Sequence, residues 1–144
     1  MVKKNLKLTA VPATDPVVQK YIVKFTEKTK YAKIGHIGWI YQQLVSTNAI
    51  NFLIVDEEGN IKSVSSFVLD GKDEAVNILT YSESKSIEET REMTEMVKEE
   101  LRKLGVQKIY AIEWGDYDRG RAAARLFGGE IVGTYIEIPL DKRR

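Results

Sequence analysis

A strand–helix–strand unit between residues 75 and 113 constrains the fold more than any other part of the chain. Residues 75–81 form a short apolar run typical of a buried strand, and residues 106–113 form a second one. Residues 86–104 lie between them and carry apolar side chains at helical spacing. When one helix joins two strands of the same sheet, the strands lie parallel and the crossover is right-handed. The fold is therefore expected to include a parallel strand pair.

The helix of this unit has sequence signals at both ends. Ser86 and Glu89 match a capping box, in which the hydroxyl and the carboxylate each accept a hydrogen bond from a free backbone N–H group. Gly105 follows the last turn, where glycine is favoured because the chain leaves the helix with positive φ. The predicted buried stripe consists of Thr90, Met93, Val97, Leu101 and Leu104.

Two further strands precede this unit. Residues 51–55 and 61–69 predict strands, and a turn over residues 56–60 joins them. A second turn, over residues 70–73, leads into the strand at 75–81. Strands joined by such short turns are antiparallel neighbours. The predicted sheet is therefore mixed.

The first part of the chain predicts one strand and two helices. Residues 5–11 alternate as a strand does. Asp15 and Pro16 then mark a helix start, because the carboxylate can cap free N–H groups and proline fits the first helical position. That helix is expected to end near Lys30, and a second one is predicted from about Trp39 to Val45.

The last part of the chain predicts one helix and one strand. Asp118 can cap a helix that contains residues 122–127 and ends before Gly128 and Gly129. Residues 130–140 predict the final strand. The expected fold is thus a single α/β domain over residues 1–144, with a mixed α+β sheet and the order β-α-α-β-β-β-α-β-α-β.

Composition excludes several kinds of chemistry. The chain has no cysteine, which rules out thiol catalysis, disulfides and Cys-ligated zinc, and its one histidine, His36, rules out a multi-histidine metal site. We therefore expect no metal. The net charge of +1 comes from interleaved charges, so no nucleic-acid partner is expected. No apolar run approaches the ~18 residues that span a bilayer, which predicts a cytoplasmic protein with no membrane partner.

Residues 120–135, with the sequence GRAAARLFGGEIVGTY, resemble the last helix and strand of GNAT-type N-acetyltransferases, usually N-x-A-A-x-x-L-Y followed by G-F-E-x-x-G. The predicted element order is also the order of that family, and it covers residues 5–140. The resemblance implies a site for acetyl-CoA where the fourth and fifth strands diverge, near Tyr81 and Glu113. It also implies that the diphosphate rests on N–H groups at the start of the following helix. The cofactor-binding residues implied in this way are Leu79, Tyr81, Ser82, Ser84, Lys85, Ser86 and Ile87.

The segment from Ser82 to Glu89 departs from the family loop Q/R-x-x-G-x-G/A. It has no glycine, no arginine or glutamine at the expected place, and more carboxylates than lysines. Glutamates in a first helical turn interact with the same helix dipole that a phosphate would use. Two interpretations follow: the serine hydroxyls and Lys85 hold the diphosphate, or the segment only caps the helix.

The resemblance also suggests catalytic residues. Glu113 is the candidate base, because it ends a strand where α/β sheets open their clefts; the alternative is a solvated carboxylate. The family's tyrosine acid corresponds to Phe127, so Tyr81 is the candidate replacement, and the alternative is a core tyrosine with a solvated hydroxyl. Other tyrosines that could serve are Tyr110, Tyr117 and Tyr135.

Two functions fit these features. The first is transfer of an acetyl group from acetyl-CoA to an amine of a small molecule or a protein, by direct attack on the thioester because cysteine is absent. The second is a catalytically silent GNAT-like binding or structural module, such as a bacteriophage virion or assembly protein. An exposed final strand would also allow a homodimer to form across a two-fold axis.

Overall fold

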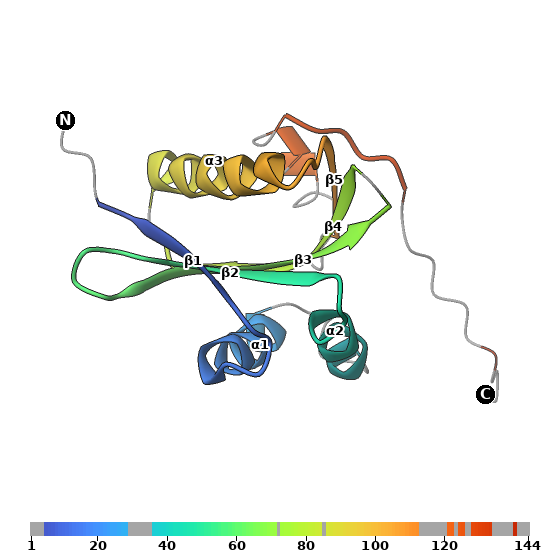
Figure 1. Cartoon of the computed structure of the whole chain (residues 1–144), viewed down its shortest axis with the longest axis horizontal. Helices are drawn as coiled ribbons and strands as arrows, with labels where there is room; N and C mark the ends of the chain where they lie inside the picture. The colour runs from blue at the N-terminus through green and yellow to red at the C-terminus, as the bar shows by residue number, and fades with distance from the viewer. Residues whose placement is uncertain are drawn as a thin grey trace. The chain divides into compact units, whose positions relative to one another are not determined.

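The computed structural model describes residues 5–28, 36–71, 73–84, 86–112, 121–122, 124–125, 128–133 and 140. They belong to two compact units, residues 1–114 and residues 115–144. The elements of the first unit follow one another in the predicted order (Figure 1). They are β1 (Lys7–Val11), α1 (Pro16–Lys28), α2 (His36–Leu44), β2 (Ala49–Val55), β3 (Ile61–Asp70), β4 (Glu74–Ser82), α3 (Ile87–Lys103) and β5 (Lys108–Ala111).

The first unit is built on a five-stranded mixed sheet in the order β1-β2-β3-β4-β5. The pairs from β1 to β4 are antiparallel, as the short turns predict, and β4 pairs with β5 in parallel across α3. The predicted parallel unit and the predicted meander are therefore both confirmed. The second helix starts at His36, earlier than the predicted Trp39.

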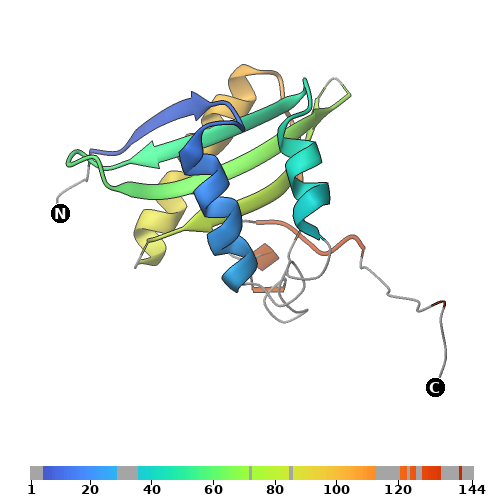
Figure 2. The ribbon, with the colours of Figure 1, turned by 90° about the horizontal axis from the view of Figure 1, so that it is seen from below.

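Helices cover both faces of the sheet. Figures 1 and 2 show α1 and α2 on one face and α3 on the other. Two apolar cores result, one on each face. The core under α1 and α2 includes Val18, Ile22, Ile40 and Leu79, and the core under α3 includes Phe52, Met93, Val97 and Leu101. The buried stripe of α3 thus matches the prediction at its centre.

The ends of α3 agree with the prediction in part. Gly105 has φ +89 and its N–H donates to Arg102 O, while the N–H of Val106 donates to Leu101 O, as in a Schellman motif. Leu104 was expected on the buried stripe but is 51% exposed, because the helix ends at Lys103 and Leu104 is the C-cap.

The second unit contains helical residues at 121–122 and 124–125, within the predicted last helix. Gly128 has φ +78, and the N–H of Gly129 donates to Ala124 O at 2.7 Å, which ends that helix. Residues 130–133, predicted to begin the final strand, have no regular secondary structure. Residues 134–139, predicted to continue it, lie outside the described residues.

Candidate functional site

The strand β4 pairs with its two neighbours over different lengths. On one side it pairs with antiparallel β3 from Glu74 to Ser82. On the other side it pairs with parallel β5 only from Glu74 to Asn77, whose partner is Ala111. One further backbone bond, from Ile112 N to Asn77 O at 3.4 Å, follows that pair. Among the described residues, β4 therefore continues beyond Asn77 with a strand partner on one side only.

A β-bulge lies at the point where pairing with β5 ends. Ser66 on β3 pairs with Leu79 and Phe67 pairs with Asn77, so Ile78 is an extra residue on β4. The Asn77 side chain spans the bulge, because its Nδ2 lies 3.1 Å from Ser66 O, 3.1 Å from Leu79 O and 3.1 Å from Thr80 Oγ1. The amide of Asn77 thus donates to a carbonyl on each of the two strands at the bulge.

The backbone groups of Thr80 and Ser82 point away from β3. The N–H of Glu83 donates to Lys62 O on β3 at 2.9 Å, and peptide groups alternate between the two sides of a strand. Thr80 and Ser82 therefore present their N–H and C=O groups to the side on which the pairing with β5 has ended. An extended ligand can pair with such a strand edge through its own amides.

Tyr81 lies at the end of β4 against α1. It is partly buried in the core under α1 and α2, and its ring centroid lies 5.0 Å from that of Tyr21. Lys24 Nζ lies 5.0 Å from the Tyr21 ring centroid and 5.8 Å from that of Tyr81, while Lys28 Nζ lies 5.0 Å from the Tyr81 centroid. Both ammonium groups are thus within cation–π range of an aromatic ring.

Glu83, in the loop after β4, forms an ion pair with Lys24 beside the two tyrosine rings. Its Oε2 lies 3.1 Å from Lys24 Nζ, and this bond lowers the pKa of Glu83 and raises the pKa of Lys24. Burial, followed by the Glu83 charge, raises the pKa of Tyr21. Tyr21, Lys24 and Glu83 were not predicted as site residues. Positions 21, 24 and 28 have the spacing of one helix face, which was the available sequence signal.

The loop between β4 and α3 is held by its own serine hydroxyls. The N–H of Ser84 donates to Ser82 Oγ at 3.1 Å, and that of Ser86 donates to Ser84 Oγ at 3.3 Å. Ser86 is the N-cap of α3 and accepts from Glu89 N at 3.0 Å, as predicted. The N–H of Ser86 was expected to donate to the Glu89 carboxylate. It donates to Ser84 Oγ instead, and the Glu89 carboxylate pairs with Lys62.

Glu89 and Lys62 form a shielded ion pair under the first turn of α3. Lys62 Nζ lies 3.2 Å from Glu89 Oε1, and the exposed fractions of the two side chains are 16% and 8%. Breaking a buried pair by removal of one partner is strongly destabilising, because the other charge stays in a low dielectric. The pair therefore ties the first turn of α3 to β3.

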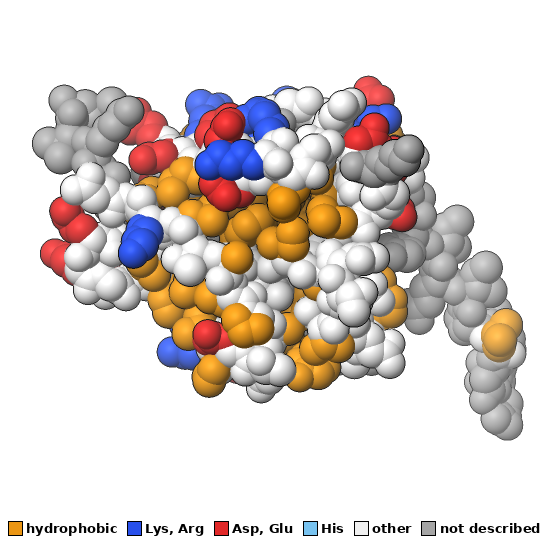
Figure 3. Space-filling view, viewed as in Figure 1, with side chains coloured by type: hydrophobic (Ala, Val, Ile, Leu, Met, Phe, Trp, Pro, Cys, Tyr) orange, Lys and Arg blue, Asp and Glu red, His pale blue; other side chains and the backbone are white. Residues whose placement is uncertain are grey.

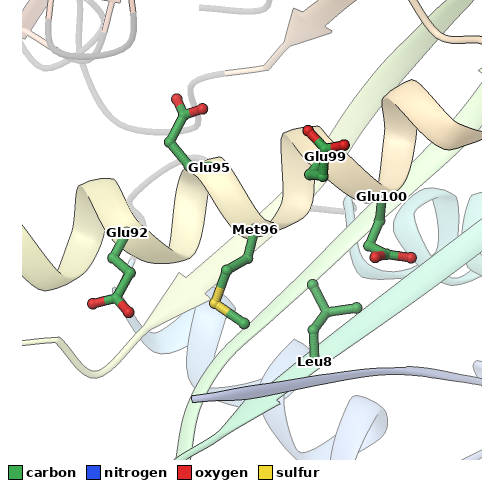
Figure 4. A pocket seen from close by; sticks show the side chains of 6 residues that line it. All are labelled: Leu8, Glu92, Glu95, Met96, Glu99 and Glu100. Carbon is green, nitrogen blue, oxygen red and sulfur yellow. The ribbon is translucent and has the colours of Figure 1, made fainter. Parts of the chain in front are cut away.

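A separate surface groove lies at the opposite edge of the sheet, between β1 and α3. It has a volume of about 400 Å³ and is lined by Leu8, Glu92, Glu95, Met96, Glu99 and Glu100. Figure 4 shows Leu8 of β1 facing Met96 of α3, and Figure 3 shows hydrophobic side chains gathered below the charged outer side of α3. Three of its glutamates already pair with cations of α3, since Glu95, Glu99 and Glu100 lie within 4.0 Å of Lys98, Arg102 and Lys103 respectively.

Two negative findings apply to the residues that the structure describes. No group of His, Asp and Glu side chains there could hold a metal ion. No helix there combines the length and the apolar character needed to cross a membrane.

The architecture is similar to that of several solved acetyltransferases. A ribosomal-protein-alanine N-acetyltransferase from Brucella melitensis biovar Abortus matches with TM-score 0.66 and 10% identity, over 94% of this chain and 99% of that one. A predicted acetyltransferase from Clostridium acetobutylicum, solved with acetyl-CoA, matches with TM-score 0.60 and 13% identity, over 94% and 96%. An aminoglycoside acetyltransferase from an uncultured soil metagenomic sample, in complex with sisomicin, matches with TM-score 0.62 and 12% identity, over 93% and 97%.

The chain has the GNAT-type acyl-CoA N-acyltransferase fold. This agrees with the family resemblance of residues 120–135 and with the predicted element order. The evidence for it is structural, since no family model matches the sequence and no curated protein matches it.

Within the GNAT fold, the predicted site residues occupy two neighbouring segments. Leu79, Tyr81 and Ser82 belong to the part of β4 beyond its pairing with β5. Ser84 and Ser86 follow in the loop, and Ile87 begins α3 with an exposed side chain. The remaining two predicted residues, Lys85 and Glu113, lie outside the described residues, as do Phe127, Tyr117 and Tyr135. Tyr110 lies on β5 and is 38% exposed.

Proposed function

We propose that this protein is an N-acetyltransferase that moves an acetyl group from acetyl-CoA to an amine of a small molecule or a protein. The observation that carries the proposal is the unequal pairing of β4 among the described residues, which ends at Asn77 on the side of β5 and at Ser82 on the side of β3. The amide-bearing pantetheine arm of the donor would lie along that edge. The Clostridium acetobutylicum structure, which contains acetyl-CoA, supports this donor for the fold.

In this proposal the strand edge holds the donor through its backbone. The outward N–H and C=O groups of Thr80 and Ser82 would pair with the amides of the arm, as an added strand does. Leu79 and Tyr81 alternate with them and fix the edge through their packing against α1. If the arm lies along this edge, Tyr81 and Ser82 both contact acetyl-CoA.

The reaction itself needs a neutral amine and a protonated leaving group. Glu113 would accept a proton from the acceptor's ammonium, directly or through water, so that the nitrogen can attack the thioester carbonyl. The C–N bond forms, the C–S bond breaks, and the CoA thiolate takes a proton. Tyr81 is the proposed acid for that last step, and a Tyr81→Phe variant that keeps full kcat would remove it from the mechanism.

One observation favours a second function, a binding or structural module without catalysis. The serine hydroxyls of the loop accept hydrogen bonds from three N–H groups at or just before the start of α3, those of Ser84, Ser86 and Glu89, which are then not free for a diphosphate. The same hydrogen bonds would be expected in a domain that does not bind CoA. Calorimetry with acetyl-CoA separates the two functions: an enzyme should bind it with a Kd of roughly micromolar order, and no heat at millimolar acetyl-CoA would leave only the module.

A pair of variants tests the placement of the donor on β4. Ser82→Pro removes the outward N–H, and Ser82→Ala is the matched control because it removes the hydroxyl but keeps the N–H. We expect Ser82→Pro to weaken acetyl-CoA binding by about five- to tenfold relative to Ser82→Ala, the size of one hydrogen bond. Equal affinities would place the donor elsewhere.

A further inference from the structure

We infer that the donor is recognised by its pantetheine arm alone, and that the start of α3 does not bind the diphosphate of CoA. The substrate class is therefore thioesters of pantetheine, with or without the nucleotide. This inference rests on the proposed function, since it assumes that a thioester arm lies along β4.

Hydrogen bonds within the protein already engage much of the loop from Glu83 to Thr90. Among its described residues, most backbone N–H groups already have acceptors within the protein. The N–H groups of Glu83 and Thr90 donate to Lys62 O and Ser86 O, and those of Ser84, Ser86 and Glu89 donate to serine hydroxyls. A phosphate that used the N–H groups of Ser84, Ser86 or Glu89 would have to displace their bonds to the serine hydroxyls, whereas at a usual anion site such groups are free to point at the ligand.

The charges beside this loop are also unfavourable for a diphosphate. Lys24 and Lys62 reach it from α1 and β3, and each pairs with a carboxylate, Glu83 at 3.1 Å and Glu89 at 3.2 Å. Glu88 adds a further exposed carboxylate in the first turn of α3. A diphosphate there would meet carboxylates whose repulsion is not offset by a cation of either pair.

The carboxylate of Glu89 lies in a shielded environment. Glu89 is only 7% exposed, so its carboxylate is shielded from water, and it pairs with Lys62. Lys62 could turn to a phosphate only by breaking its ion pair with this buried carboxylate, which is unfavourable. The pantetheine arm meets none of these obstacles, because it is uncharged and β4 presents outward backbone groups.

The deciding experiment is calorimetry of the full chain with two probes, acetyl-CoA and S-acetylpantetheine. If the nucleotide is not recognised, the two Kd values should differ by less than about tenfold, because one charge-assisted hydrogen bond alone is worth about that much. An acetyl-CoA preference larger than this overturns the inference and leaves the proposed function intact. Binding of neither probe overturns both.

A pair of variants examines the role of the ion pair. Glu83→Gln releases the Lys24 ammonium beside the loop, so acetyl-CoA should bind about three- to tenfold more tightly while S-acetylpantetheine is unaffected. Glu100→Gln is the matched control, because it removes a carboxylate from an ion pair near the other end of α3 and should change neither Kd. An unchanged ratio of the two Kd values in Glu83→Gln contradicts the argument from the paired lysines, and thermal melts confirm that both variants are folded.

Discussion

The two halves of β4 show how one strand can have a structural part and an open part. From Glu74 to Asn77 the strand is paired on both sides, and beyond the bulge at Ile78 the described residues pair it with β3 alone. Both halves come from one apolar run in the sequence. The difference between them lies in hydrogen bonding, because the first half uses its backbone groups within the sheet and the second half directs those of Thr80 and Ser82 to the side on which the pairing with β5 has ended.

The largest expected effect is that of proline in the first half. Val76→Pro removes a backbone N–H from a strand that lies between two partners, so we expect a loss of at least about 3 kcal/mol in the free energy of unfolding. Ser82→Pro in the second half should cost under about 1 kcal/mol, because its N–H points away from β3 and edge positions tolerate proline. Urea denaturation measures both. Similar losses would mean that the two halves do not differ in pairing.

A smaller effect is expected at the boundary between the halves. Asn77→Val removes the amide that serves Ser66 O and Leu79 O, so we expect about 2 kcal/mol of destabilisation from carbonyls left without that donor. Amide hydrogen exchange at Ile78 and Leu79 should also become faster, since the bulge loses the hydrogen bonds from the Asn77 side chain. Asn60→Val is a control at an exposed turn and should change stability by less than about 0.5 kcal/mol. A loss for Asn77→Val no larger than that of the control would show that the amide does not hold the bulge.

The smallest effect concerns the ion pair just beyond the second half. The bond to Lys24 lowers the pKa of Glu83 from its ordinary value of 4.5, so its folded pKa lies below its unfolded pKa. The stabilisation is therefore present above pH 4.5 and is lost as the pH falls through the folded pKa. Denaturation of the wild type and of Glu83→Gln should give a small stability difference at neutral pH that disappears once the pH falls below the folded pKa of Glu83. A difference that does not change with pH would exclude this pair as its source.

Much of the fold was predictable because its signals are local. Helix caps at Asp15 and Ser86 and the glycine after α3 mark element ends within a few residues, and the structure has all of them: Val17 N donates to Asp15 Oδ1 at 2.9 Å, and Ser86 and Gly105 hold their expected places. The short turns and the helical crossover then determine which strands are neighbours.

The parts of the site that were missed depend on contacts between distant residues. A strand with a bulge and a regular strand can have the same apolar sequence pattern, so residues 75–81 did not predict the extra residue at Ile78. Lys24 and Glu83 are 59 positions apart, and Lys62 and Glu89 also come from different elements. The predicted bond from the Ser86 N–H to the Glu89 carboxylate was wrong for the same reason. The carboxylate pairs with Lys62 of β3, a contact that the local sequence does not reveal.

The extra residue in β4 also changes which core the side chains of the strand enter. Side chains alternate between the two faces of a sheet, and Ala75 packs in the core under α3. Strict alternation would send every second residue after it, Leu79 and Tyr81 included, to that same face. Both pack instead in the core under α1 and α2, because Ile78 shifts the phase of the alternation by one. A single inserted position thus lets one strand contribute its odd-numbered side chains first to one helical layer and then to the other.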